Sequence, residues 1–163
     1  MARLARKAGL DVLALTLTDP GNLRGDAQTA WQDAQAADVP TTIFTATSLK
    51  DADLLVDAIL GTGLEREVSG AWRDTIEAMN ACPADILAID IPSGLHADTG
   101  AILGVAIQAA ATITFIGMKQ GLLTGQGPAC RGELHFADLE VPPDIYRAIH
   151  PACWRYAGDD LAG

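Results

Sequence analysis

The chain has 163 residues, of which 49% are hydrophobic and 20% charged, a composition that suits one globular domain with a full apolar core. Its net charge of −10 argues against a generic nucleic-acid surface, because phosphate binding needs clustered Lys and Arg side chains. No apolar stretch is long enough to span a bilayer, and the N-terminus lacks the uncharged core of a signal peptide. Cys82, Cys130 and Cys153 have no paired spacing, which favours reduced thiols in a cytoplasm over a disulfide framework.

The first third of the chain alternates helical and extended patterns. Residues 1–9 predict the end of a helix that Gly9 caps, and residues 12–17 predict the strand that follows. An apolar stripe through residues 26–37 predicts a helix with Asp26 as its N-cap. Residues 41–45 predict the next strand.

The remaining sequence repeats this alternation. Strands are predicted at residues 54–60, 86–89, 111–116 and 133–139, and helices at residues 71–81 and 104–110. Such alternation indicates an α/β fold with a largely parallel sheet, and the near-continuous apolar runs at 54–60 and 112–115 predict a sheet covered on both faces. Residues 143–163 contain prolines without a clear period, so we interpret them as a tail or linker.

The run VDAILGTGL places Asp57 near the end of a strand and Gly61 and Gly63 just after it. Ligands of open parallel sheets bind beyond the carboxyl ends of the strands, and glycines let backbone amides approach a ligand closely. A plain strand-to-helix turn explains the same glycines. The run is not a dinucleotide fingerprint, because Arg66 occupies the position of the third glycine.

Two further strand ends carry polar residues. In DIPSGLHADTG, Asp90 stands where the apolar strand meets solvent, which suits acid–base chemistry, although an Asp that bonds the following turn amides is the alternative. Ser93 supplies a hydroxyl in the same loop. Lys119 follows the strand at 111–116, where it can pair with a phosphate or with Asp90, or simply be solvated.

The histidines indicate neither a metal site nor a hydrolase. His96, His135 and His150 have no ligand spacing with one another or with a cysteine, so a transition-metal site is not expected. Ser93 has no evident histidine partner, which argues against a catalytic triad.

These three motifs, in this order, resemble the YjeF N-terminal domain family, the NAD(P)H-hydrate epimerases. The resemblance extends over residues 2–142, and its most specific part is the Asp-Ile-Pro-Ser-Gly segment. It implies a Rossmann-like three-layer αβα sandwich, usually homodimeric. It also implies an epimerase that interconverts the R and S forms of hydrated NADH and NADPH (NADHX and NADPHX), fused to or working with an ADP- or ATP-dependent dehydratase.

The resemblance also implies roles for individual residues. Asp57 and Ser93 match ligands of a bound potassium ion, Asp90 matches a carboxylate that contacts the substrate, and Lys119 matches a lysine of the same pocket. The loop that holds the hydrated nucleotide corresponds to Gly61, Thr62, Gly63, Leu64, Glu65, Arg66 and Glu67. We expect Asp90 and Lys119 to be catalytic, with Asp90 protonating the leaving hydroxyl and then activating water while Lys119 tunes that acid.

One feature of the family has no counterpart here. The family carries a first strand and an Asn-Asn-Gly-Gly-Asp loop before the helix that matches residues 1–9, so we expect an N-terminally truncated epimerase-type domain at residues 1–142. The missing strand would lie between the strands at 12–17 and 54–60. A non-catalytic binding or scaffold domain of the same fold, or an inactive fragment, is the alternative: the retained polar residues favour the enzyme, and the absent loop favours the alternative.

Overall fold

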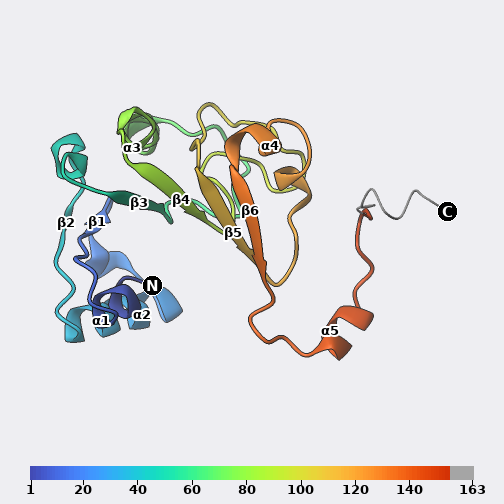
Figure 1. The fold of residues 1–163 in the computed structure, drawn as a ribbon, viewed down its shortest axis with the longest axis horizontal. Coiled ribbons are helices and arrows are strands. Elements are labelled where there is room, and N and C mark those ends of the chain that lie inside the picture. The colour runs from blue at the N-terminus through green and yellow to red at the C-terminus, as the bar shows by residue number, and fades with distance from the viewer. Residues whose placement is uncertain (155–163) are drawn as a thin grey trace. The chain divides into compact units, whose positions relative to one another are not determined.

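A computed structural model describes residues 1–154, which form two compact units, each with its own β-sheet (Figure 1). Unit 1 comprises Met1–Ala52 and Ser69–Cys82. Unit 2 comprises Asp53–Val68 and the chain from Pro83 onward. Both sheets are parallel throughout, which confirms the predicted α/β class.

Unit 1 contains the predicted first two strands and the three longer N-terminal helices. Its elements are α1 (Ala2–Lys7), β1 (Ala14–Thr16), η1 (Pro20–Asn22), α2 (Gly25–Ala36), β2 (Thr41–Ile43), η2 (Ala46–Leu49) and α3 (Gly70–Ala81). Gly9, at φ 87°, follows α1 and confirms the predicted glycine cap. Asp26 is not the N-cap of α2: Gly25, at φ 58°, lets the helix begin earlier, and Asp26 lies in its first turn.

The buried side chains of unit 1 come from α3 and from the segments around β2. Ile76 and Met79 of α3 are buried, as the helical spacing predicted, and Val39 and Leu49 are buried in the same unit. Cys82, just after α3, donates its thiol to the carbonyl of Leu49. These contacts hold α3 against η2.

Unit 2 is built on a four-stranded sheet of order β3-β4-β5-β6 (Figure 1). Its elements are β3 (Leu54–Asp57), β4 (Asp85–Ile89), β5 (Ala111–Phe115), η3 (Gln120–Leu122), α4 (Gly127–Cys130), β6 (Glu133–Ala137) and α5 (Pro143–Arg147). In the register, Asp57 lies opposite Ala88, and Ala88 lies opposite Thr112. Because the strands are parallel, all four carboxyl ends lie at one edge of the sheet, where the sequence placed its motifs.

The strand predicted at 54–60 is shorter than expected and is not covered on both faces. It ends at Asp57, because the Asp57 carboxylate turns to accept hydrogen bonds from the loop after β4. Leu55 and Asp57 are buried, whereas Leu54 and Val56 on the opposite face are 54% and 44% exposed. The prediction of two covered faces is therefore wrong for this strand.

Residues 104–110 are not the predicted helix. The segment bonds to other parts of the chain instead: Ile107 donates its N–H to the Ser93 carbonyl at 2.9 Å, and Ala109 donates to Cys130 at 2.8 Å. Its small apolar side chains are buried beside the loop after β4, so tertiary bonding outweighs a weak local helical pattern. The resulting core cluster contains Ile91, Leu95, Ala97, Ala106, Leu122 and Cys130.

The predicted tail contains one short helix, α5. The last residues of the tail, 155–163, lie outside the described part of the chain. β1 and β3, between which a further strand was expected, belong to different sheets. Across residues 1–154, no helix combines the length and apolarity needed to cross a membrane.

Candidate functional site

Asp57 and Ser93 form a buried, hydrogen-bonded pair at the carboxyl edge of the unit 2 sheet. The Asp57 side chain is fully buried at the end of β3. Its Oδ2 accepts the Ser93 N–H at 2.7 Å, and its Oδ1 accepts the Ser93 hydroxyl at 2.6 Å. Burial raises the pKa of Asp57 above its ordinary value, and the hydrogen bonds from Ser93 oppose that rise only in part. No ion pair of residues 1–154 compensates this carboxylate.

The same pair is surrounded by further oxygen atoms. The Ser93 Oγ accepts the Leu60 N–H at 2.8 Å and lies 3.2 Å from the Leu60 carbonyl oxygen. A hydroxyl has one hydrogen, and the shorter bond to Asp57 uses it, so the Leu60 carbonyl faces Ser93 without that proton. A carboxylate, a hydroxyl and a carbonyl therefore converge, which is the all-oxygen ligand set that a hard cation such as potassium requires.

Asp90 and Lys119 form the second pair, on the neighbouring strand ends. The Asp90 Oδ1 accepts the Lys119 ammonium, the Thr114 hydroxyl at 3.2 Å and the Phe115 N–H at 3.1 Å. Lys119 also donates to the Phe115 carbonyl at 2.9 Å. The two charged side chains remain 29% and 17% exposed, so the pair is held from several sides yet accessible to a small molecule. Of the alternatives for Lys119, the structure shows the pairing with Asp90.

The loop after β4 joins these two pairs. It carries Asp90 and Ser93 three residues apart, and Ser93 reaches back to Asp57 on the adjacent strand. Asp57, Asp90, Ser93 and Lys119, predicted from three separate motifs, therefore lie along one edge of one sheet.

The predicted nucleotide loop begins beside this edge and is open. A Cβ added at Gly61 or Gly63 would meet no atom within 4 Å. Thr62, Glu65, Arg66 and Glu67 are exposed, whereas Leu64 is half-buried. The Glu67 side chain lies over Gly104, where an added Cβ would come within 2.7 Å of the Glu67 Cγ.

The sequence motifs did not reveal the groups that support the charged pairs. Thr114 and the main chain of Phe115 hold Asp90, and the main chain of Leu60 approaches Ser93. A signal for Thr114 exists, because Thr112 and Thr114 alternate along an otherwise apolar strand and therefore share one buried face. Main-chain groups leave no such signal in a sequence.

Interlocked glycines fix the loops that follow Ser93 and Lys119. Gly100 accepts the Gln126 N–H at 2.8 Å, and Gly121 packs so closely that an added Cβ would lie 2.2 Å from the His96 carbonyl oxygen. An added Cβ at Gly100 would lie 2.0 Å from the Thr124 carbonyl oxygen. The two loops therefore meet backbone to backbone, which ties the Ser93 loop to the Lys119 loop.

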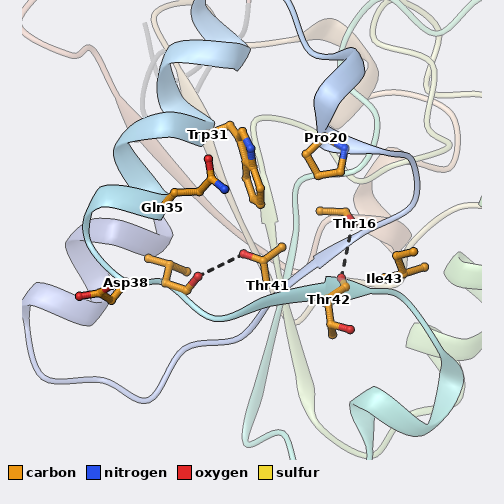
Figure 2. A pocket seen from close by; sticks show the side chains of 9 residues that line it. Thr16, Pro20, Trp31, Gln35, Asp38, Thr41, Thr42 and Ile43 are labelled. Atoms are coloured by element: carbon orange, nitrogen blue, oxygen red, sulfur yellow. Dashed lines mark hydrogen bonds between the residues drawn. The ribbon is translucent and has the colours of Figure 1, made fainter.

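A cavity of about 540 Å³ lies elsewhere, within unit 1 (Figure 2). Trp31 of α2 and Pro20 lie above Thr16 and Thr41 of β1 and β2, as Figure 2 shows. No predicted site residue lines this cavity, so the polar pairs on unit 2 remain the candidate site.

Comparison with known proteins decides the family. A family model described as YjeF-related protein N-terminus matches residues 1–121. The chain belongs to this YjeF-related family. An NAD(P)H-hydrate epimerase of Limosilactobacillus fermentum is 41% identical over 138 residues, covering 85% of this chain and 66% of the relative. A bifunctional NAD(P)H-hydrate repair enzyme of Coxiella burnetii is 36% identical and aligns with 91% of this chain but only 30% of its own length.

The fold has a counterpart among solved structures. The crystal structure of the yeast protein ynu0 superimposes with a TM-score of 0.76 at 16% identity, covering 98% of this chain and 68% of the yeast chain. This likeness shows a Rossmann-like fold, as predicted. The chain spans 66% and 65% of the length of the epimerases of Limosilactobacillus fermentum and Levilactobacillus brevis, just under two thirds of each.

Proposed function

We propose that the chain acts as an NAD(P)H-hydrate epimerase, interconverting the R and S forms of hydrated NADH and NADPH. The observation that carries this proposal is the partly exposed Asp90–Lys119 pair, which lies beside the Asp57–Ser93 pair and the open glycine loop. The curated relatives bear the corresponding name. A carboxylate and an ammonium at one solvent-accessible point suit a reaction that needs a proton delivered and then removed.

The reaction requires the hydroxyl on the reduced nicotinamide ring to leave and return on the other face. Protonation of the hydroxyl breaks the C–O bond and releases water, while the ring nitrogen lone pair forms an iminium ion. A water molecule then adds to the opposite face and loses one proton. Atoms and charge balance over the cycle, so the protein needs only to position the ring and exchange one proton.

We propose complementary roles for the two charged residues. The Lys119 ammonium, which is paired with Asp90, would protonate the departing hydroxyl. Asp90 can then accept the proton of the incoming water, and the bonds from Thr114 and Phe115 keep its carboxylate oriented. In this proposal Lys119 donates the proton that the sequence led us to expect from Asp90, with Lys119 tuning that acid.

A potassium ion at the Asp57–Ser93 pair is part of this proposal. Asp57, Ser93 and the Leu60 carbonyl would hold it, and the ion would supply the positive charge that the buried carboxylate lacks. Asp57 itself holds Ser93 in place by accepting its N–H. It thereby also fixes the loop that carries Asp90 three residues before Ser93.

The remaining parts of the proposal concern binding and context. Main-chain amides of residues 61–67 would approach the hydrated nucleotide, since nothing covers Gly61 and Gly63. We further propose a homodimer in the cytoplasm that works with an ADP- or ATP-dependent dehydratase. The bifunctional relatives support the link to a dehydratase, and the three free cysteines support a reducing compartment.

The decisive test replaces Asp90 by Asn and Lys119 by Met. Each variant should lower the rate of R-to-S exchange of hydrated NADH by about 100-fold or more, the usual contribution of a positioned acid or base. An S-specific dehydratase, added in excess, reports the exchange. Asp85→Asn is the matched control, because Asp85 is an exposed carboxylate at the opposite end of β4. Near-normal turnover of Asp90→Asn would remove the pair from the mechanism, and no exchange by the wild-type chain in potassium would favour a binding or scaffold domain.

A further inference from the structure

Two adjacent strands of unit 2 end in the same uncommon turn. After β4, Ile91 donates its N–H to the Ile89 carbonyl at 2.9 Å. After β5, Gly117 donates to the Phe115 carbonyl at 2.6 Å. Each is a three-residue γ-turn, and the central residues, Asp90 and Ile116, have φ values of 71° and 61°.

A γ-turn with a positive central φ is rare and strained, and glycine is the residue that adopts positive φ without cost. Asp tolerates this region better than most residues, and the turn at Asp90 directs its carboxylate to Lys119 and Thr114. Ile116 has neither advantage. It is β-branched, which makes positive φ least favourable, and its side chain has no hydrogen-bonding group.

Burial of the side chain does not offset the backbone strain at Ile116 either, because the residue is 47% exposed. The protein therefore carries backbone strain for a side chain that contributes little to its core. Strain of this kind is retained at ligand sites, where the benefit appears only when a ligand is bound.

The surroundings of Ile116 are those of the candidate site. The preceding residue, Phe115, uses its N–H to hold Asp90 and its carbonyl to hold Lys119. The following residue, Gly117, is open, with no atom within 4 Å of an added Cβ. Met118 is 39% exposed, so two partly exposed apolar residues lie in the short segment between Phe115 and Lys119.

We infer that Ile116 is a specificity-determining residue that contacts the substrate, packing its side chain against the reduced nicotinamide ring whose hydroxyl faces Lys119 and Asp90. This inference rests on the proposed function for the identity of the ring. An apolar surface next to one acid–base pair fits a ligand with a flat, largely apolar ring bearing a single polar group at its edge.

The test compares Ile116→Gly and Ile116→Asn with Leu139→Gly. Gly and Asn both tolerate positive φ, so these variants keep the turn and remove the hydrocarbon side chain. Leu139 is the matched control: it is also strained, at φ 53°, and 57% exposed, but it lies in the turn after β6 and bonds neither Asp90 nor Lys119. Affinity is measured by titration calorimetry with the equilibrium mixture of R and S hydrated NADH, and folding by denaturant midpoint.

Both Ile116 variants should bind the mixture about fivefold more weakly or worse, as loss of an apolar contact predicts, with Leu139→Gly unchanged. Ile116→Gly should also unfold at or above the wild-type midpoint, which separates a ligand role from a folding role. Equal affinity of all four proteins, or no binding by the wild type, would overturn the inference. Weakened binding in a chain that does not epimerise would retain this inference and remove the proposed function.

Discussion

Among the single residues of the site, Asp57 is the carboxylate whose burial most directly lowers the stability of the fold. It is fully buried, and its bonds come from Ser93 and from the main chain of Ile59 rather than from a cation. A buried carboxylate without a counter-ion lowers stability whenever it is ionised, which is the situation that a bound cation corrects.

The raised pKa of Asp57 predicts how stability changes with pH. The ordinary value is 3.8, and burial moves the folded-state pKa above it. The stability that Asp57 contributes is therefore fully present below pH 3.8 and is lost as pH rises through the folded-state pKa. In Asp57→Asn this loss disappears, while the amide still accepts the Ser93 N–H and donates to the Ser93 hydroxyl.

The measurement is the unfolding free energy of both proteins in potassium-free buffer from pH 3.5 to pH 7.5, roughly the range over which a carboxyl of raised pKa titrates. The difference should move in favour of Asp57→Asn as pH rises. Taking the difference cancels the contributions of other carboxylates, including Asp90. A difference that does not vary with pH would show that Asp57 titrates alike in the folded and unfolded chain.

Among the elements, those set by local patterns were predictable. Short apolar runs, most of them containing β-branched residues, located the six strands of residues 1–154, and apolar spacing located the helices at Gly25–Ala36 and Gly70–Ala81. The prediction failed where distant backbone competes for the same chain. Residues 104–110 bond to Ser93 and Cys130, and β3 ends at Asp57 because its carboxylate bonds the Ser93 loop. No local signal encodes either partner.

The candidate site was predictable to the same extent. Its charged and hydroxyl residues each follow a strand, and parallel strands bring such residues to one edge. The γ-turn at Ile116 was not foreseen, since β-branched residues ordinarily predict extended backbone. The interlock of Gly100 with Thr124 was also missed, because glycines separated by a whole strand show no spacing rule.

The close contact between Gly100 and Thr124 predicts that alanine substitutions at different glycines of unit 2 change stability by different amounts. Gly100→Ala combines positive φ (70°) with a Cβ 2.0 Å from the Thr124 carbonyl oxygen, and neither backbone can yield cheaply. We expect a loss of about 3 kcal/mol in unfolding free energy. Gly63→Ala, whose added Cβ meets open space, should change stability by about 0.5 kcal/mol or less. Urea unfolding of both variants checks this, and equal losses would mean that the interlock does not stabilise the fold.

At the scale of the whole molecule, the chain passes between its two units three times, yet the site belongs to one of them. Unit 1 takes residues up to 52 and then 69–82, and unit 2 takes the rest of the described chain. Asp57, Leu60, Ser93, Asp90 and Lys119 all lie in unit 2. The residues proposed to hold potassium and to exchange the proton therefore all come from one unit.

This division into two units predicts which elements potassium binding protects from amide hydrogen exchange. At a free potassium concentration about ten times its Kd, binding stabilises the state that holds the ion by about 1.4 kcal/mol. Amide hydrogen exchange, compared in potassium chloride and in choline chloride of equal ionic strength, should slow about tenfold in β3, β4 and β5. Exchange in α2 and α3 of unit 1 should not change, because local opening of unit 1 leaves the ligands in place.

Asp57→Asn supplies the control for that experiment, since it keeps the hydrogen bond to the Ser93 N–H but lacks the anionic ligand. Its exchange should be the same in both salts. Equal slowing in α2 and α3 would mean that the two units open together, whereas no slowing in β3–β5 of the wild type would mean that the oxygen cluster binds no potassium. Protection that is confined to unit 2 and abolished by Asp57→Asn is the one pattern that places the ion at Asp57. A general salt effect would persist in Asp57→Asn, and global stabilisation would also slow exchange in unit 1.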